Sequence, residues 1–311
     1  MLENLILFLL VCYIADLVIG DPARWPHPVR ILGSCLNYIE PKVRNSGFNL
    51  KFCGFAVLAA GIVLALTAAT LLISIPYLKI LMSIYLGYAS LALGCLIYEA
   101  RKVQMLIASG RLEEARKALS QLVTRDTEQL DEQGLYQTLA ETTSENYNDA
   151  FCAPFFYLSL LGVPWVWAYK MVSTMDSMWG YKTQKWKELG FAGAKLDDIL
   201  AYIPARMAAL SMLAAGYVLR WPGRVNITDV IKDAGKLDSP NAGWTMSAGA
   251  HLLGVKMGGT ASYFGKDRDK PILGHGNEKY SSGKIDQLIS LILVSSILYA
   301  LVFTGLSVMI Y

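Results

Sequence analysis

Ionisable and amide side chains are concentrated between Arg125 and Arg206, in a chain that is otherwise strongly apolar. Glu141, Glu145 and Asp149 recur there at every fourth position, so on a helix they form one acidic stripe. Three like charges in line disfavour a helix by roughly a few tenths of a kcal/mol per pair, so something must compensate them. A hard cation such as Mg²⁺ prefers carboxylate oxygens together with water and nucleotide phosphates. The stripe therefore predicts a Mg²⁺ site, with a solvated helix face as the alternative.

Two further acidic groups follow this stripe along the chain. Asp176 and Lys182 flank a glycine, and together they could supply a metal ligand and a cation that binds phosphate. The same residue types also form ordinary caps and turns. Asp197 and Asp198 are adjacent, so their side chains leave a helix on different faces. We expect one of the two to serve a site and the other to cap a helix or pair with Lys195.

Charged residues also lie within or beside the apolar segments. Arg206 follows Pro204 inside an apolar run, where a charge is costly, and it is a candidate for binding a carboxylate or phosphate with both guanidinium nitrogens. Asp21 and His27 belong to the proline-rich turn GDPARWPHPVR after the first apolar segment. The prolines make this turn rigid, and the two polar side chains could face a ligand held over it.

Glycine and amide residues gather toward the C-terminal third of the chain. Asn241 lies in SPNAGW, and the segment GVKMGG follows at residues 254–259. Glycine lets backbone N–H groups approach an anion closely, although ordinary loop turns explain the same composition. The sequence contains no GxxxxGK[ST] phosphate loop, so any use of ATP lies outside that pattern. Asp126 and Gln129, which precede Glu141 in the sequence, resemble a helix N-cap box.

The composition indicates an integral membrane protein. Of 311 residues, 54% are hydrophobic and only 17% are charged, against about 25% charged residues in ordinary soluble domains. The net charge of +3 is too small to argue for a nucleic-acid partner. The five cysteines are scattered without a CxxC pair and predict reduced, packed thiols. The three histidines are far apart in sequence, so a zinc site would require them to converge in the fold.

The apolar segments predict an all-α, polytopic fold with about four transmembrane helices. The predicted spans are residues 2–19, 52–75, 77–98 and 288–310, each close to or above the roughly 20 residues that cross a bilayer core. Two weaker segments, Phe151–Tyr169 and Ile199–Leu219, are interrupted by proline and are expected to be re-entrant or buried broken helices. We expect one membrane domain over residues 1–311, with helical motif regions at residues 20–51 and 99–287.

The distribution of Lys and Arg predicts the orientation. Basic residues follow the first and third predicted spans and both weak segments, and they include Arg24 and Arg224. Under the positive-inside rule these loops are cytoplasmic, which places the motif regions on the cytoplasmic side of the cell membrane.

Six motifs in this order resemble the adenosylcobinamide-phosphate synthases of cobalamin biosynthesis. They are GDP…PHPV, RDT, ETxxEN, TxDSM-x-GY, LDD…PAR and SPNAGW, and they extend from about Asp16 to Gly274. The resemblance implies a membrane enzyme that joins adenosylcobyric acid to an aminopropanol, or its phosphate, through an amide bond driven by ATP and Mg²⁺. It also implies contact with the lipid bilayer and allows contact with other late membrane enzymes of the corrinoid pathway.

The resemblance also suggests roles for the polar residues. Glu141, Glu145, Asp149 and Asp176 are assigned to Mg-ATP or acyl-phosphate chemistry, with Glu141, Glu145 and Asp176 as Mg²⁺ ligands. The remaining candidates bind phosphate, carboxylate or substrate amides, and they are Arg125, Asp126, Asn146, Lys182, Asp197, Asp198, Arg206, Asn241, Asp21 and His27.

Two other classes of protein stay open. A membrane protein of the same architecture that acts in signalling or regulation should have lost several of these ionisable residues, and this chain keeps them. A corrinoid transporter would favour inverted repeats with broken helices near the bilayer midplane. The sequence has two broken segments but no repeat.

Overall fold

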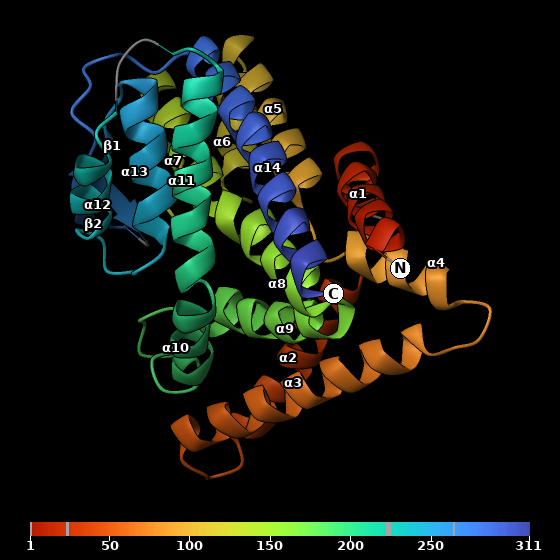
Figure 1. The fold of residues 1–311 in the computed structure, drawn as a ribbon. Coiled ribbons are helices and arrows are strands. Elements are labelled where there is room, and N and C mark those ends of the chain that lie inside the picture. The colour runs from red at the N-terminus through yellow and green to blue at the C-terminus, as the bar shows by residue number, and fades with distance from the viewer. Residues whose placement is uncertain (1, 23–24, 222–224, 264) are drawn as a thin grey trace. The chain divides into compact units, whose positions relative to one another are not determined.

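The computed structural model describes residues 2–22, 25–221, 225–263 and 265–311, and the chain is mainly helical (Figure 1). Arg24 and Arg224, which support the predicted orientation, lie outside the described residues. The contacts divide the chain into two compact units. Unit 1 comprises Met1–Gly94, Ala153–Ala201 and Val302–Tyr311, and unit 2 comprises Cys95–Cys152 and Tyr202–Leu301. Whether the chain acts as one membrane domain stays a prediction.

The elements follow one another in this order along the chain: α1 (Leu2–Ile19), α2 (Pro28–Arg44), α3 (Leu50–Ile73), α4 (Lys79–Tyr88), α5 (Leu93–Ala108), α6 (Leu112–Leu119), α7 (Glu132–Tyr147), the π-helical turn η1 (Asn148–Cys152), α8 (Ala153–Leu161), α9 (Val163–Trp179), α10 (Phe191–Leu200), α11 (Tyr202–Val218), α12 (Ile227–Ala234), α13 (Ala242–Leu253), β1 (Met257–Tyr263), β2 (Lys266–Leu273) and α14 (Ser282–Ile310).

Among the described residues, three helical segments are long and apolar enough to cross a membrane: α3, Lys79–Ala108 and α14. The pair α10 and α11 is a fourth candidate, as a broken span or a re-entrant segment, and α1 is a shorter apolar helix. In α3, Val63, Leu64 and Leu71 are each more than 60% exposed, so an apolar environment other than the protein must cover them. The prediction of a helical protein with about four membrane helices is confirmed.

The two weak apolar segments are broken helices, as expected. Phe151–Tyr169 becomes η1, α8 and the start of α9, with the break at Gly162. Gly162 has φ +83°, a backbone conformation that only glycine adopts without strain, and Pro164 starts the next helix. Within the described residues, neither α8 nor α9 is among the candidate spans.

Unit 1 is built on close packing between α9 and its neighbours. Gly61 in α3 makes room for Met171 of α9, and Gly54 faces the carbonyl of Leu189, where a Cβ atom would clash. Between α4 and α5 the chain breaks at residues 89–92, and the buried Asp16 of α1 closes this break. Its Oδ2 accepts hydrogen bonds from the backbone N–H groups of Leu93 (3.0 Å) and Gly94 (3.4 Å). These donors start a helix and have no partner within it.

Unit 2 is centred on α13, which is rich in small residues and packs against α7, α11 and α12. Gly243 approaches the carbonyl of Ala234, and Gly249 approaches the hydroxyl of Ser144, so neither position has space for a larger residue. The antiparallel hairpin β1–β2, which the sequence did not predict, lies beside α12 and α13 (Figure 1). It pairs Tyr263 with Lys266 at its tip.

One local prediction is wrong. Asp126 and Gln129 do not cap a helix, because α7 begins at Glu132 with Asp131 as its N-cap. The Asp131 carboxylate accepts a hydrogen bond from the Gly134 N–H at 2.7 Å. Asp126 instead binds the hairpin, a tertiary contact that local spacing does not reveal.

Candidate functional site

The best-defined polar cluster of unit 2 surrounds Glu141, which is buried on α7. Its Oε2 accepts a hydrogen bond from Arg125 at 2.5 Å. Its Oε1 accepts from the Gly258 backbone N–H at 2.7 Å and from the Gln137 side chain at 2.8 Å. Both carboxylate oxygens therefore already bind protein donors, and a metal at Glu141 would have to displace or share one of them.

Arg125 holds the loop before α7 against this carboxylate. It also donates to the hydroxyl of Thr138 at 2.9 Å. Burial alone would lower the pKa of the Arg125 guanidinium, but the charge of Glu141 and a hydrogen bond with Tyr263 outweigh burial and raise it. Arg125 is thus a fixed positive charge, and the protein has pre-oriented it.

A cavity of about 1070 Å³ lies next to this ion pair, between the α6–α7 segment and the hairpin. Its lining includes two further cations, Arg116 and Lys117, several hydroxyl groups, and the carboxylates of Glu113, Asp126 and Glu128. Arg116 is paired with Glu113 at 2.6 Å. Asp126 fixes the opposite wall, because its Oδ2 accepts from the Ser262 hydroxyl and the Gly265 N–H, both at 2.8 Å. Cations, hydroxyls and backbone donors of this kind suit an anionic ligand such as a phosphate.

The acidic stripe predicted from the sequence is present, and the α-helix changes to a π-helical turn between its second and third residues. Glu141 and Glu145 lie on α7, and Asp149 lies on η1. Single π-helical turns often occur at functional sites. Loss of hydration raises the pKa of Glu145, Lys270 opposes this shift, and the charges of Asp149 and Glu141 add to it. The Glu145 side chain is nonetheless exposed to solvent, so a soluble cation can reach it.

The other predicted residues of unit 2 have mixed surroundings. Arg206 stacks on the rings of Tyr202 and Trp244, at 3.2 and 4.6 Å from their centroids, and donates to the Tyr202 carbonyl at 2.6 Å. Asn146 donates to the Thr142 hydroxyl at 3.0 Å. Asn241 is buried at the start of α13. Arg206 therefore combines a cation with an aromatic surface, which suits a partly apolar anionic ligand.

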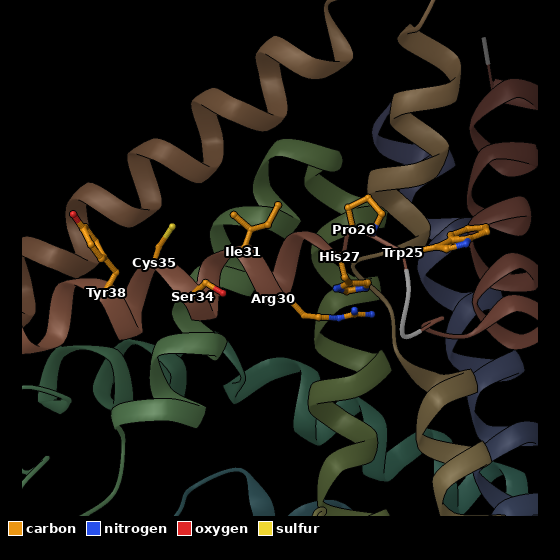
Figure 2. Close-up of a pocket in the computed structure, with 8 residues that line it drawn as sticks. All are labelled: Trp25, Pro26, His27, Arg30, Ile31, Ser34, Cys35 and Tyr38. Carbon is orange, nitrogen blue, oxygen red and sulfur yellow. The ribbon is translucent and has the colours of Figure 1, made fainter.

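In unit 1 the proline-rich turn brings Asp21 and His27 together, with 3.0 Å between a carboxylate oxygen and the imidazole Nε2. Both residues line a cavity of about 180 Å³ that also includes Arg30 and Lys170. A second, shallower pocket of about 430 Å³ shares His27 and Arg30 (Figure 2). Figure 2 shows Ile31, Cys35 and Tyr38 at helical intervals along α2 in this second pocket.

The remaining predicted residues also belong to unit 1. Asp176 is in the last turn of α9, where its backbone carbonyl accepts from the Gly180 N–H at 2.6 Å. Lys182 is exposed in the segment after α9. Asp198 pairs with Lys195 at 3.5 Å, as expected for one of the two adjacent aspartates, and Asp197 is half-buried on α10.

Sequence reasoning missed several partners of the acidic stripe. Gln137, Gly258 and Lys270 were not candidates, although Gly258 belongs to the GVKMGG segment. That segment was expected to present backbone N–H groups to an anion, and Gly258 does so, but the anion is the Glu141 carboxylate of the protein itself. Only the fold could identify this acceptor, because the two residues are 117 positions apart.

Comparison with known proteins places these residues in a family. The model of the CobD/Cbib protein family matches residues 9–292. A protein named cobalamin biosynthesis protein CobD from Listeria monocytogenes serotype 4b is 35% identical over 314 residues, covering 99% of this chain and 100% of the relative. The CobD protein of Photorhabdus laumondii is 34% identical, covering 94% of each chain, and the CbiB protein of Salmonella typhi is 33% identical, covering 93% of each. No solved structure matches. The chain belongs to the CobD/CbiB family.

Proposed function

We propose that this protein acts in cobalamin biosynthesis as an ATP-dependent synthase that joins adenosylcobyric acid to aminopropanol or aminopropanol phosphate. Family membership and the names of the relatives support the pathway. The observation that carries the reaction type is the cavity of about 1070 Å³ in unit 2, with Arg116, Lys117 and the anchored Arg125 in its lining. A site that activates a carboxylate must bind several phosphates, and this cavity has the volume for them and three cations that could contact phosphate oxygens.

The chemistry has two balanced steps. The carboxylate of the corrinoid attacks the γ-phosphorus of ATP, which forms an acyl phosphate and releases ADP. The amine then attacks the acyl carbon, the amide forms, and phosphate leaves together with one proton. The first step brings together several negative charges, so cations must lower the repulsion between them.

The residues around the cavity fit the charge requirement of this reaction. Arg116, Lys117 and Arg125 are proposed to bind phosphate oxygens of the nucleotide or the amine substrate. Glu145 and Asp149 are proposed to bind a divalent cation because both are exposed carboxylates that follow one another on α7 and η1. Glu141 and Asp176 stay proposed Mg²⁺ ligands. Mg²⁺ bound by Glu145 and Asp149 would neutralise phosphate charge.

We further propose that the protein is a multi-pass protein of the cytoplasmic membrane with its motif regions facing the cytoplasm. The apolar helices support membrane insertion, and the basic loops support the orientation. A reporter fused after Lys185 should be active only in the cytoplasm. A reporter there that is accessible only from outside would contradict the orientation.

The decisive assay is amide formation by the purified protein in detergent, with adenosylcobyric acid, aminopropanol phosphate, ATP and Mg²⁺. Product should form only when ATP is present. Glu145→Gln should lower the rate at least about 100-fold, whereas Glu132→Gln, the same change at an exposed position of α7, should keep it. Corrinoid movement across vesicles without ATP and without product would instead indicate a transporter.

A further inference from the structure

Three residues from separate elements of unit 2 converge. Asp233 lies in the last turn of α12, His251 lies on α13, and His275 follows β2. One ligand atom of each lies within 4.8 Å of the other two. The His251 Nε2 is 2.9 Å from Asp233 Oδ2, and the two imidazole rings meet edge to face with their centroids 4.5 Å apart.

A fourth ligand, a second carboxylate, is available on the same helix as Asp233. Asp229 precedes Asp233 by four residues, so both side chains leave the same face of α12. Its Oδ2 lies 4.0 Å from the His275 Nε2. Asp229 and His275 are exposed, whereas Asp233 and His251 are largely inaccessible, so the cluster opens to solvent on one side.

We propose that Asp233, His251 and His275, with Asp229 as the fourth ligand, form a Zn²⁺ site that links α12, α13 and the segment after the hairpin. Two imidazole nitrogens and two carboxylate oxygens are typical tetrahedral Zn²⁺ ligands, with bonds of about 2.0 to 2.2 Å. Ligand atoms around such an ion lie about 3.3 Å from each other. The distance from His251 Nε2 to Asp233 Oδ2 is 2.9 Å, and that from His275 Nε2 to Asp229 Oδ2 is 4.0 Å, so the two lie on either side of this value. The exposed His275 side chain can move to shorten the longer distance.

The surrounding donors fit an outer shell for this site. The Gly274 N–H donates to Asp233 Oδ2 at 2.8 Å, and such a hydrogen bond orients a ligating carboxylate. The Lys236 ammonium lies 2.6 Å from Asp233 Oδ1. Lys236 also neutralises Asp233 without a metal, so its ammonium competes with Zn²⁺ for the same carboxylate charge. A variant without the Lys236 ammonium therefore tests whether the Asp233 carboxylate binds Zn²⁺.

The test uses the full-length protein in detergent, purified through a histidine-free tag and stripped of metal with a chelator. Zn²⁺ is titrated against a chromophoric chelator of known affinity. The unmodified protein should bind one equivalent, and His275→Ala should weaken binding by at least about 10- to 100-fold, the loss that even outer-shell changes cause. His275 is exposed, so this variant keeps the packing of α12 and α13.

Two further variants complete the experiment. His27→Ala, in unit 1, removes the third histidine of the chain and should leave Zn²⁺ affinity unchanged. Lys236→Met should bind Zn²⁺ at least as tightly as the unmodified protein, because the competing ammonium is gone. The proposal is overturned if His275→Ala binds Zn²⁺ as the unmodified protein does, if His27→Ala alone loses the equivalent, or if Lys236→Met binds more weakly.

Discussion

At the residue scale, two glutamates one helical turn apart have opposite environments. Glu141 is buried, and Arg125, Gln137 and the Gly258 N–H satisfy it. Glu145 is exposed at the surface, yet desolvation raises its pKa, with the charges of Asp149 and Glu141 adding to this shift and Lys270 opposing it. A carboxylate whose two oxygens both accept hydrogen bonds from the protein stabilises the fold. A carboxylate whose pKa is raised by its surroundings gains more from a bound cation. The sequence pattern made the two residues equivalent, and the structure separates them.

The raised pKa of Glu145 predicts that this residue costs stability when no cation is bound. Protonation favours the folded state here, so the cost is absent below the ordinary pKa of a glutamate and appears as the pH rises through the raised pKa. Glu145→Gln should therefore unfold at a higher temperature than the unmodified protein at pH 7.5 without Mg²⁺. The difference should vanish near pH 4. Thermal unfolding followed by circular dichroism in detergent measures both.

Saturating Mg²⁺ provides the control for this prediction. A bound cation relieves the repulsion, so the unmodified protein should gain thermal stability from Mg²⁺ and Glu145→Gln should gain less. A destabilised Glu145→Gln at pH 7.5 would show that the glutamate is a stabilising residue, contrary to the prediction.

At the scale of elements, the hairpin β1–β2 holds the parts of the cavity together. Gly258 on β1 binds Glu141, and Asp126 binds Ser262 and Gly265 near the tip. The cavity wall therefore depends on two contacts between a helical region and a two-stranded sheet. A lone two-stranded hairpin is marginal in water, so these contacts also stabilise the hairpin.

Gly258 cannot be replaced without disturbing this arrangement. It has φ +96°, and a Cβ atom would lie 2.1 Å from the carbonyl oxygen of Pro271. Gly258→Ala should lower the free energy of unfolding by more than about 3 kcal/mol, from backbone strain of about 1–3 kcal/mol together with the clash. Gly259→Ala is the matched control, because Gly259 has φ +88° and open space at the Cβ position.

The two variants separate strain from clash in one experiment. Gly259→Ala should show the strain alone, and Gly258→Ala should also reduce amide formation because the Glu141 donor moves. Equal unfolding temperatures for the two variants would mean that the contact with Pro271 is relieved by a small shift and that the clash carries no cost.

At the scale of the whole molecule, the apolar helices were predictable and the polar contacts were not. The predicted spans at residues 52–75 and 288–310 fall largely on the candidate spans α3 and α14, whereas the predicted span at residues 2–19 is only a shorter apolar helix, α1. The break at Gly162 follows from glycine and proline. Apolar length and backbone breakers are local properties, so the sequence carries them directly. The hairpin was missed because Lys266, Asp267, Arg268 and Asp269 on β2 give no apolar alternation. The Asp126 cap was wrong because Ser262 and Gly265, remote in sequence, compete for its carboxylate.

The buried Asp16 gives a prediction on the stability of unit 1. Asp16→Ala removes the acceptor for two backbone donors at the start of α5 and should cost about 1–3 kcal/mol of unfolding free energy. Asn49→Ala is the control, because it removes an exposed cap at α3, where Asn49 accepts from Phe52 at 3.1 Å, and should cost about 1 kcal/mol. Unfolding in detergent compares the two variants. A smaller loss for Asp16→Ala than for Asn49→Ala would show that water replaces the carboxylate.

The position of Asp16 has a consequence for the order in which the chain assembles during synthesis. The ribosome completes α1 before it synthesises α5. The Asp16 carboxylate therefore has no backbone donors when the first apolar helix leaves the ribosome. When residues 89–94 emerge, the start of α5 finds its acceptor only if α1 has stayed nearby. Expressing residues 1–49 and 50–311 as two chains separates α1 from α5. Insertion of α4 and α5 should then be slow when the second fragment is made alone, and it should be faster when both fragments are made together.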